Sequence, residues 1–229
     1  MAGDKSLIII EYPDRELLAI GLANALSEDL ESCLLHQEHA SFVVPGGTTP
    51  GPVFDVLCAA DLDWSRVHVM PSDERWVAQD DPRSNARLIR ERLLVNRAAA
   101  AQFLPLLRPV ARPEDALGDL IATLAPELPV SVLLLGMGAD MHTASLFPGV
   151  DGLDAALDPH GDILAVMRPN AVPEARVTFS AHVLDGALCK HLVMFGADKR
   201  AALDRATNLP PHQAPVNAVL TGMTIHWAE

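Results

Sequence analysis

The sequence predicts an α/β fold, a doubly wound and mostly parallel sheet with helices on both faces, formed as a single domain over residues 1–229. Short apolar runs alternate along the chain with segments whose leucines recur at helical spacing. Of the 229 residues, 49% are hydrophobic but only 4% are aromatic, so Leu, Val and Ala supply most of the core. Alternating strands and helices with this composition are typical of a parallel sheet covered by helices, and the length suits one such domain.

In the first half of the chain, apolar spacing and capping residues set the elements. Leu18, Leu22, Leu26 and Leu30 recur on one face of a long helix, and Ser84 is placed to cap a later one. The expected elements are a strand at 6–11, a helix at 14–35, a strand at 40–45, a helix through 58, a strand at 67–71 and a helix from 84 through 95.

In the second half, the run 130–135 is the most apolar strand of the chain. It should therefore be central and buried on both faces. A proline-limited connection is expected at 108–113. The other expected elements are a helix at 114–124, strands at 163–167, 177–180 and 192–195, a helix from 198 and a final short strand at 223–227.

Four polar or glycine-rich segments follow directly after expected strands. In a parallel sheet, ligands bind outside the carboxyl ends of the strands, which share one edge. We therefore expect these segments to meet there and to form the functional site. They are residues 46–48, 73–75, 136–142 and 196–199.

The charge and cysteine content exclude several classes of protein. The formal net charge is −13, with 17 basic against 30 acidic residues, which is the wrong balance for a nucleic-acid binder. Cys33, Cys58 and Cys189 are distant from one another and odd in number, so buried thiols in a reducing cytosol are expected rather than disulfides. No signal peptide or membrane-spanning run is visible, and we expect a cytoplasmic protein with no membrane partner.

The segment Gly46, Gly47 and Thr48 follows a strand and opens a helix. Glycines let the backbone approach a ligand closely, and successive N–H groups can hold an oxyanion. A plain strand-to-helix turn would have the same sequence, so both interpretations stay open.

Asp140 and His142 place a carboxylate two residues before an imidazole, just past the central strand. An unperturbed histidine titrates near pH 6.5 and can accept a proton from water at neutral pH. The alternative is a solvated loop histidine, but the position after the central strand favours a catalytic role.

Charged residues also lie near the ends of other expected strands. Asp73 and Glu74 precede Arg75, whose guanidinium suits bidentate phosphate recognition. A surface ion-pair cluster is the alternative, and a structural role is favoured for Glu74. Arg176 and Lys199 are further cations near expected strand ends, although such cations are often only solvated.

The sequence lacks the motifs of several other classes of enzyme and binding site. Met141 occupies the place of the third glycine in a dinucleotide-binding G-x-G-x-x-G, and no phosphate-binding G-x-x-x-x-G-K-[ST] loop or G-x-S-x-G elbow occurs. No His or Cys cluster has metal-ligand spacing, and Asp140 with His142 offers too few ligands for zinc. We therefore expect neither a metal nor a nicotinamide or flavin cofactor.

The segment GMGADMHTASLFPG, residues 136–149, closely resembles the signature of the 6-phosphogluconolactonase family, usually G-x-G-x-D-G-H-T-A-S-L-F-P-G. Other segments resemble family motifs in the same order along the chain. They are PGGTTP at 45–50, SDERWV at 72–77 followed by Asp81, Ser84 and Asn85, RVT at 176–178, and the G-x-x-K segment at 196–199. The resemblance spans essentially the whole chain.

This resemblance implies hydrolysis of 6-phosphogluconolactone, a small sugar-phosphate lactone, in the oxidative pentose phosphate pathway, by general-base activation of water and without a required cofactor. It implies that His142 is the general base and that Asp140 and Asp73 orient groups in the site. The residues implied to bind the phosphate or its neighbourhood are Arg75, Arg176, Lys199, Gly46, Gly47 and Thr48.

One position departs from the family pattern, because Met141 stands where the family commonly has Gly. A non-glycine residue at positive φ would be strained. We therefore predict a negative φ for Met141.

Two alternatives come from different classes. A glucosamine-6-phosphate isomerase/deaminase would usually carry D-G-H-I-A-F-N-E, but the acidic residue expected soon after His142 is absent. A non-catalytic sugar-phosphate sensor would usually carry a DNA-binding extension, for which the first strand at residue 6 leaves no room. The sequence does not determine the oligomeric state, and a monomer is favoured.

Overall fold

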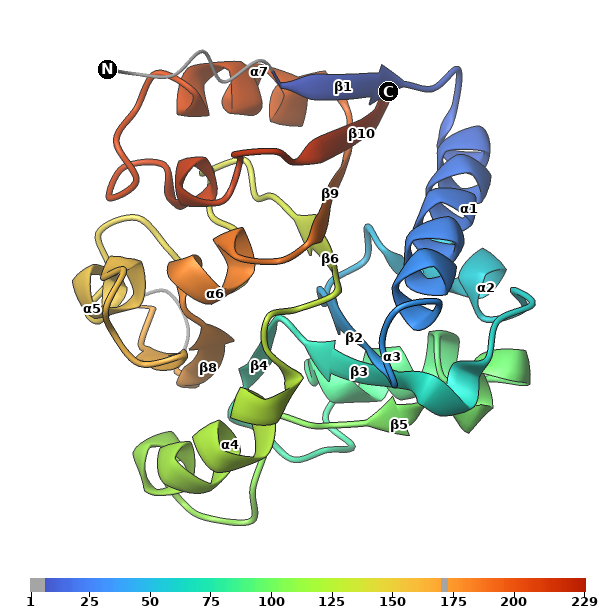
Figure 1. Ribbon diagram of the computed structural model, residues 1–229. Helices are drawn as coiled ribbons and strands as arrows, with labels where there is room; N and C mark the ends of the chain where they lie inside the picture. Colours follow the sequence, from blue (N-terminus) through green and yellow to red (C-terminus); the bar gives the residue numbers. More distant parts are fainter. Residues whose placement is uncertain (1–6, 170–172) are drawn as a thin grey trace.

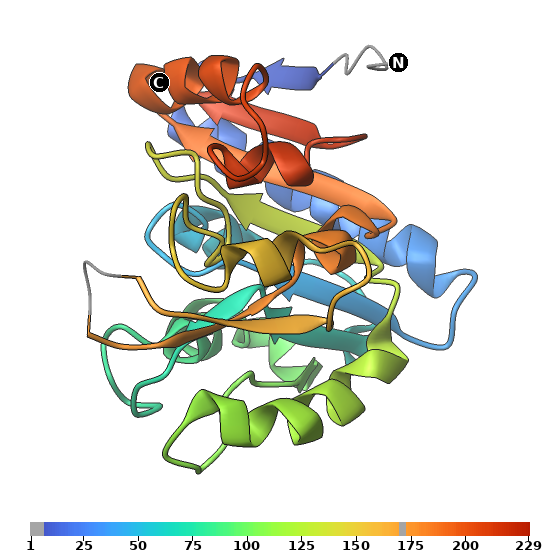
Figure 2. The same ribbon diagram turned by 90° about the vertical axis from the view of Figure 1, so that its left-hand side faces the viewer.

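The computed structural model describes residues 7–169 and 173–229, and within these ranges the strands form two sheets. The larger sheet has seven strands in the order β1-β10-β9-β6-β2-β3-β5, and all its pairings are parallel. Figure 2 shows these strands stacked from blue β1 at the top down to teal β3. The predicted fold class is therefore confirmed.

The strands of the larger sheet are β1 (Ile8–Glu11), β2 (Ala40–Val44), β3 (Val67–Pro71), β5 (Gln102–Phe103), β6 (Val132–Gly136), β9 (Cys189–Phe195) and β10 (Thr224–Ala228). The smaller sheet holds β4 (Asp73–Arg75), β8 (Arg176–Phe179) and β7 (Leu164–Met167), paired antiparallel in that order. The predicted start of the first strand at Ser6 lies outside the described residues.

The α-helices are α1 (Arg15–Leu34), α2 (Gly51–Leu57), α3 (Asn85–Arg92), α4 (Leu117–Leu124), α5 (Leu153–Leu157), α6 (Ala181–Asp185) and α7 (Ala197–Ala206). Short 3-10 turns are η1 (Trp64–Arg66), η2 (Asn96–Ala100), η3 (Pro113–Ala116), η4 (Ala125–Glu127) and η5 (Pro215–Ala218). Ser84 caps α3 as predicted, since its hydroxyl accepts a hydrogen bond from the N–H of Arg87 at 3.2 Å.

Side chains on the central strands alternate between two apolar cores, one on each face of the larger sheet. Phe42 and Val44 pack with Leu134 against α1, α2 and α3, whereas Val43 and Leu133 pack on the opposite face with α4 to α7. Figure 1 shows these two groups of helices on either side of the sheet. The period of two places every other residue on the same face, and so near-continuous apolar runs serve both cores.

The order of the strands reverses beside β2. After β2 the chain continues outward to β3 and β5, then returns so that β6 lies on the other side of β2, followed by β9 and β10. The loops that leave β2 and β6 therefore diverge, and they open a crevice at the carboxyl ends of these strands.

The small antiparallel sheet corrects two sequence expectations. Asp73 to Arg75 is not a loop but a strand, and the runs at 164–167 and 176–179 belong to this second sheet rather than to the parallel one. Ser72 links the sheets, because its N–H donates to Val44 and its carbonyl accepts from Phe179. The sequence also did not predict α5 and α6, which have only five residues each.

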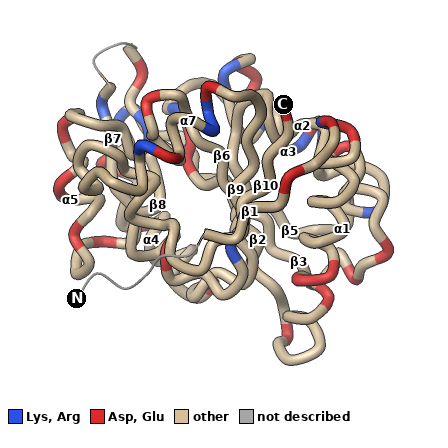
Figure 3. The backbone as a smooth tube through the Cα atoms, turned by 90° about the horizontal axis from the view of Figure 1, so that it is seen from above, with Lys and Arg blue, Asp and Glu red and all other residues tan. Residues whose placement is uncertain are grey.

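The surface carries more acidic than basic side chains. Figure 3 shows Asp and Glu spread over the outer loops and helices, with Lys and Arg between them. Among the described residues, no helix is both long and apolar enough to cross a membrane.

Candidate active site

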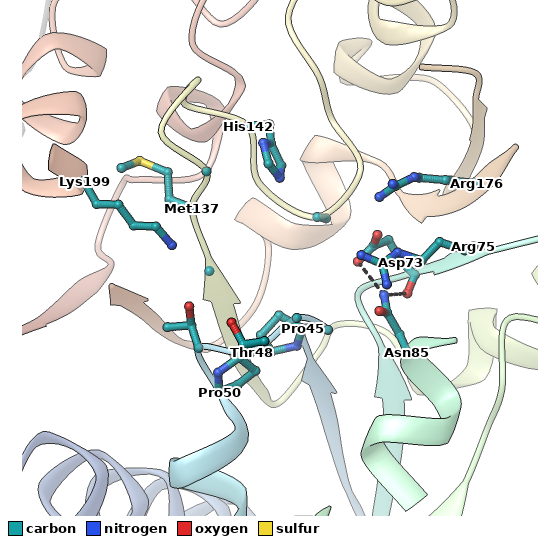
Figure 4. Close-up of a pocket in the computed structure, with 16 residues that line it drawn as sticks. Pro45, Thr48, Pro50, Asp73, Arg75, Asn85, Met137, His142, Arg176 and Lys199 are labelled. Carbon is teal, nitrogen blue, oxygen red and sulfur yellow. Dashed lines mark hydrogen bonds between the residues drawn. The ribbon is translucent and has the colours of Figure 1, made fainter. Parts of the chain in front are cut away.

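A cleft of about 250 Å³ lies at the carboxyl ends of β2 and β6, where the strand order reverses. It is lined by segments that are distant in the sequence, including the loops after β2 and β6 and both strands of the β4–β8 pair (Figure 4). The lining residues are Pro45, Gly46, Gly47, Thr48, Thr49, Pro50, Asp73, Arg75, Asn85, Gly136, Met137, Gly138, His142, Ala144, Arg176 and Lys199.

A tight turn after β6 presents His142 to the cleft. The N–H of Gly138 donates to the carbonyl of His142 at 2.9 Å, and the His142 Nδ1 lies 2.5 Å from Asp140 Oδ1. This contact with His142 is the main cause that lowers the pKa of the Asp140 carboxyl. Gly138 permits the pairing, since a Cβ there would lie 2.2 Å from the His142 Nδ1.

The Asp73 carboxylate is buried beside the cleft and is held by hydroxyl groups. Ser145 donates to its Oδ2 at 2.5 Å and Ser72 to its Oδ1 at 3.0 Å. The Asn85 amide donates to the Asp73 carbonyl at 2.8 Å, and this contact fixes Asn85 at the wall of the cleft. The Asn85 Oδ1 is buried without a partner among the described residues, so one acceptor remains there.

Two arginines lie opposite each other on the antiparallel β4–β8 pair. Arg75 is in register with Arg176, and like charges directly opposed on neighbouring strands destabilise a sheet unless something compensates them. The pKa of Arg176 is lowered, first by burial and then by the charge of Arg75. Both Nε atoms are buried without a hydrogen-bond partner in the described part of the chain. This arrangement is suited to an anion that would neutralise the pair.

Two further groups complete the cleft. Lys199 in the first turn of α7 extends toward it from the side opposite Arg176, with His142 between them (Figure 4). Burial lowers the pKa of the Lys199 ammonium. The loop Gly46–Thr48 forms the floor, and Gly47 has a φ of 83°, in the region that favours glycine.

The prediction of a negative φ for Met141 is wrong, because its φ is 67°. Hydrogen bonds on both sides impose this conformation. The Met141 N–H donates to Gly138 at 3.0 Å, and the Met141 carbonyl accepts from the N–H of Val216 at 3.1 Å. Met has no branch at Cβ and its side chain packs partly buried against the core, which offsets a strain of roughly 1–2 kcal/mol.

Among the residues singled out in the sequence, those lining the cleft are Gly46, Gly47, Thr48, Asp73, Arg75, His142, Arg176 and Lys199. Asp140 stands behind His142, with its side chain 57% exposed. Glu74 has the structural role favoured for it: its buried carboxylate accepts from the N–H groups of Asn85 and Ala86 at the start of α3. Sequence reasoning assigned no role to Ser145, whose contact with Asp73 no spacing rule could reveal.

A cleft at a strand-order reversal, with an imidazole–carboxylate pair and three converging cations, defines an α/β protein for small phosphorylated ligands. Its sequence matches the family described as glucosamine-6-phosphate isomerases/6-phosphogluconolactonase over residues 13–227. The chain belongs to this family.

Similar proteins agree with this assignment. The 6-phosphogluconolactonase of Pseudomonas aeruginosa is 42% identical, over 91% of this chain and 90% of that protein. That of Mesorhizobium japonicum is 38% identical, over 95% of this chain and 93% of its own length. The crystal structure of a 6-phosphogluconolactonase from Shewanella baltica superposes with a TM-score of 0.94 at 31% identity, covering 98% of this chain and 99% of that one.

Proposed function

We propose that this protein is an enzyme that hydrolyses 6-phospho-D-glucono-1,5-lactone to 6-phosphogluconate in the oxidative pentose phosphate pathway. Relatives that bear this activity in their names match over nine tenths of the chain or more. The isomerase branch of the family is not favoured, since the residues after His142 are Thr-Ala-Ser-Leu-Phe-Pro, without an early acid.

The observation that carries this proposal is the charge pattern of the cleft. Arg75 and Arg176 are opposed cations on one wall, and neither forms an ion pair with a described carboxylate. His142 lies between them and Lys199. A phosphate carries nearly two negative charges at neutral pH and accepts charge-assisted hydrogen bonds from guanidinium groups. A sugar-phosphate lactone therefore has its phosphate at the arginines and its ester carbon near the imidazole.

His142 acts as the general base in the proposed mechanism. Because Asp140 engages Nδ1, Nε2 is the nitrogen that accepts a proton from water as the water attacks C1 of the lactone. The Asp140 carboxylate fixes the ring and stabilises the imidazolium that forms. Backbone N–H groups of the glycine loop at 46–47 receive the developing oxyanion.

The remaining polar groups position the substrate. The contacts to the phosphate are remote from the reacting carbon, so the binding energy that they supply orients the lactone ring. Gly46, Gly47 and Thr48 form the floor under the sugar, while Asp73 orients groups through its contacts with Ser72 and Ser145. An activated ester needs no covalent nucleophile, and these groups suffice for the reaction.

We also propose that the protein acts in the cytoplasm as a single-domain monomer. Three cysteines without disulfides are typical of a reducing compartment, and the family match spans almost the whole chain as one unit.

The first test is a lactonase assay on freshly made 6-phosphogluconolactone, corrected for spontaneous opening. Wild-type protein should accelerate hydrolysis, and His142→Ala should lower kcat by ~10²–10⁴-fold with little change in KM. His212→Ala, at an exposed histidine, is the control. A change in KM alone would show that His142 is not the base, and ammonia release from glucosamine 6-phosphate would favour the isomerase.

The second test concerns the phosphate. Arg75→Ala should raise KM by at least about tenfold, since it removes a charge-assisted contact, whereas kcat should change less. Arg112→Ala, which removes an exposed arginine paired with Asp115, should leave both constants unchanged. If Arg75→Ala retains wild-type affinity for phosphorylated ligands, Arg75 is not in the phosphate site.

A further inference from the structure

Two histidines and one glutamate meet at the end of the sheet opposite the cleft. His39 directly precedes β2, His68 lies near the start of β3, and Glu127 ends the turn η4 before β6. All three residues therefore lie toward the amino ends of neighbouring strands, whereas the cleft lies at the carboxyl ends. A five-residue strand is roughly 17 Å long, so this cluster is separate from the cleft.

The geometry brings three metal-binding atoms together. Glu127 Oε2 lies 3.1 Å from His39 Nε2 and 2.9 Å from His68 Nδ1, and the three atoms lie within 4.8 Å of one another. Ligands bound to one zinc ion at 2.0–2.2 Å in tetrahedral geometry are separated by roughly 3.4 Å. The two contacts of Glu127 need to lengthen by only a few tenths of an ångström to reach this spacing, and the two ring nitrogens already lie within 4.8 Å of each other.

Strand pairing and hydrogen bonds to backbone carbonyls hold the segments that carry His39 and His68. His68 is held in the sheet by pairing with both β2 and β5. Arg66 holds the segment before His39, because its guanidinium donates to the carbonyls of Leu34, Gln37 and Glu38. The two imidazole rings stack with their centroids 4.2 Å apart. The backbone that carries both histidines is therefore held before any ion binds, and the stacked rings have to turn so that both nitrogens face one ion.

Burial and access both suit a cation. The side chains of Glu127 and His68 are 10% and 17% exposed, whereas that of His39 is 36% exposed. A cavity of about 270 Å³ borders His39 and Glu127 and is also lined by Glu38 and Ser41. An ion can enter on this side, and a water molecule can occupy a fourth coordination position.

We propose that His39, His68 and Glu127 form a binding site for a divalent transition-metal ion of the zinc class. Two imidazoles and one carboxylate are a known ligand set for Zn²⁺. Without an ion, the carboxylate is hydrogen-bonded to His68 and lies in ion-pair contact with His39, and the metal replaces these two contacts. The residues are widely separated in sequence, so no ligand-spacing motif reveals the site.

The test measures metal binding directly. Metal-free protein is titrated with Zn²⁺ by calorimetry at neutral pH, and with Co²⁺ by visible absorption, which intensifies when the ion is tetrahedral. We expect one ion per chain with a Kd of about 10 µM or tighter. His39→Ala and Glu127→Gln should each weaken binding by at least about tenfold.

Two matched variants complete the design. His36→Ala removes an exposed histidine from the same segment and should bind the ion as the wild type does. His142→Ala should also bind it normally, and His39→Ala should keep wild-type lactonase constants in metal-free buffer. The proposal is overturned if wild-type protein binds no Zn²⁺ at ~100 µM, if His39→Ala and Glu127→Gln bind it as tightly as wild type, or if His142→Ala abolishes binding.

Discussion

His226 makes the stability of the protein depend on pH. It is fully buried on β10, where Nε2 lies 3.0 Å from the Nδ1 of His191 and Nδ1 lies 2.9 Å from the hydroxyl of Tyr12. The chain of contacts ends at Asp29, which lies 2.7 Å from His191. Burial, and secondly the neighbouring His191, lower the pKa of His226 from 6.5 to about 4, although Asp29 opposes the shift.

The direction of the effect follows from the two pKa values. Between pH 6.5 and about 4, the unfolded chain binds a proton at His226 that the folded protein does not. Acidification through this window therefore favours unfolding. The loss of unfolding free energy should reach about 2 kcal/mol by pH 5 and about 3 kcal/mol near pH 4, at 1.36 kcal/mol for each pKa unit.

Urea denaturation between pH 7.5 and 5 measures this loss. His226→Gln keeps a polar side chain that does not titrate, so its unfolding free energy should fall by about 2 kcal/mol less than that of the wild type over this range. His212→Gln, at an exposed site, should follow the wild type. The difference between variants also cancels Glu74, whose pKa is raised by burial and whose effect is opposite. Parallel profiles for wild type and His226→Gln would refute the reasoning.

Two remaining predictions concern the architecture of the cleft. Gly138→Ala should lower kcat/KM by about 10²-fold in a lactonase assay, because the new Cβ displaces His142, while thermal stability stays close to wild type. The control is Gly118→Ala, where a Cβ meets no described atom within 4 Å. Equal activities of the two variants would contradict this prediction. Glu74→Gln should lower the unfolding free energy measured in urea by about 2 kcal/mol, because the amide cannot accept the hydrogen bonds from both Asn85 and Ala86. An unchanged denaturation midpoint would show that the carboxylate does not cap α3.

Sequence patterns predicted the elements whose signals are local. The leucine period of α1 and the apolar run of β6 are strong signals. In each element, the buried side chains recur in the sequence at the spacing of that element. The order of strands and polar segments also predicted where the cleft would form, since parallel strands share a carboxyl edge.

The features that sequence missed depend on partners distant in the chain. Asp73 to Arg75 is a strand only because β8 pairs with it. The positive φ of Met141 is set by hydrogen bonds to Gly138 and Val216, and neither is visible in the local sequence. The separation of His68 from Glu127 by 59 positions hides their contact in the same way.

The opposed arginines on β4 and β8 have a practical consequence for work with this protein. Two opposed guanidinium groups that form no ion pair with any described carboxylate bind oxyanions in general, and they do not distinguish a sugar phosphate from inorganic phosphate or sulfate. Buffers that contain these ions should occupy the site, relieve the repulsion and raise the melting temperature. The same buffers would then act as competitive inhibitors, so kinetic constants should be measured in zwitterionic buffers with chloride as the main anion.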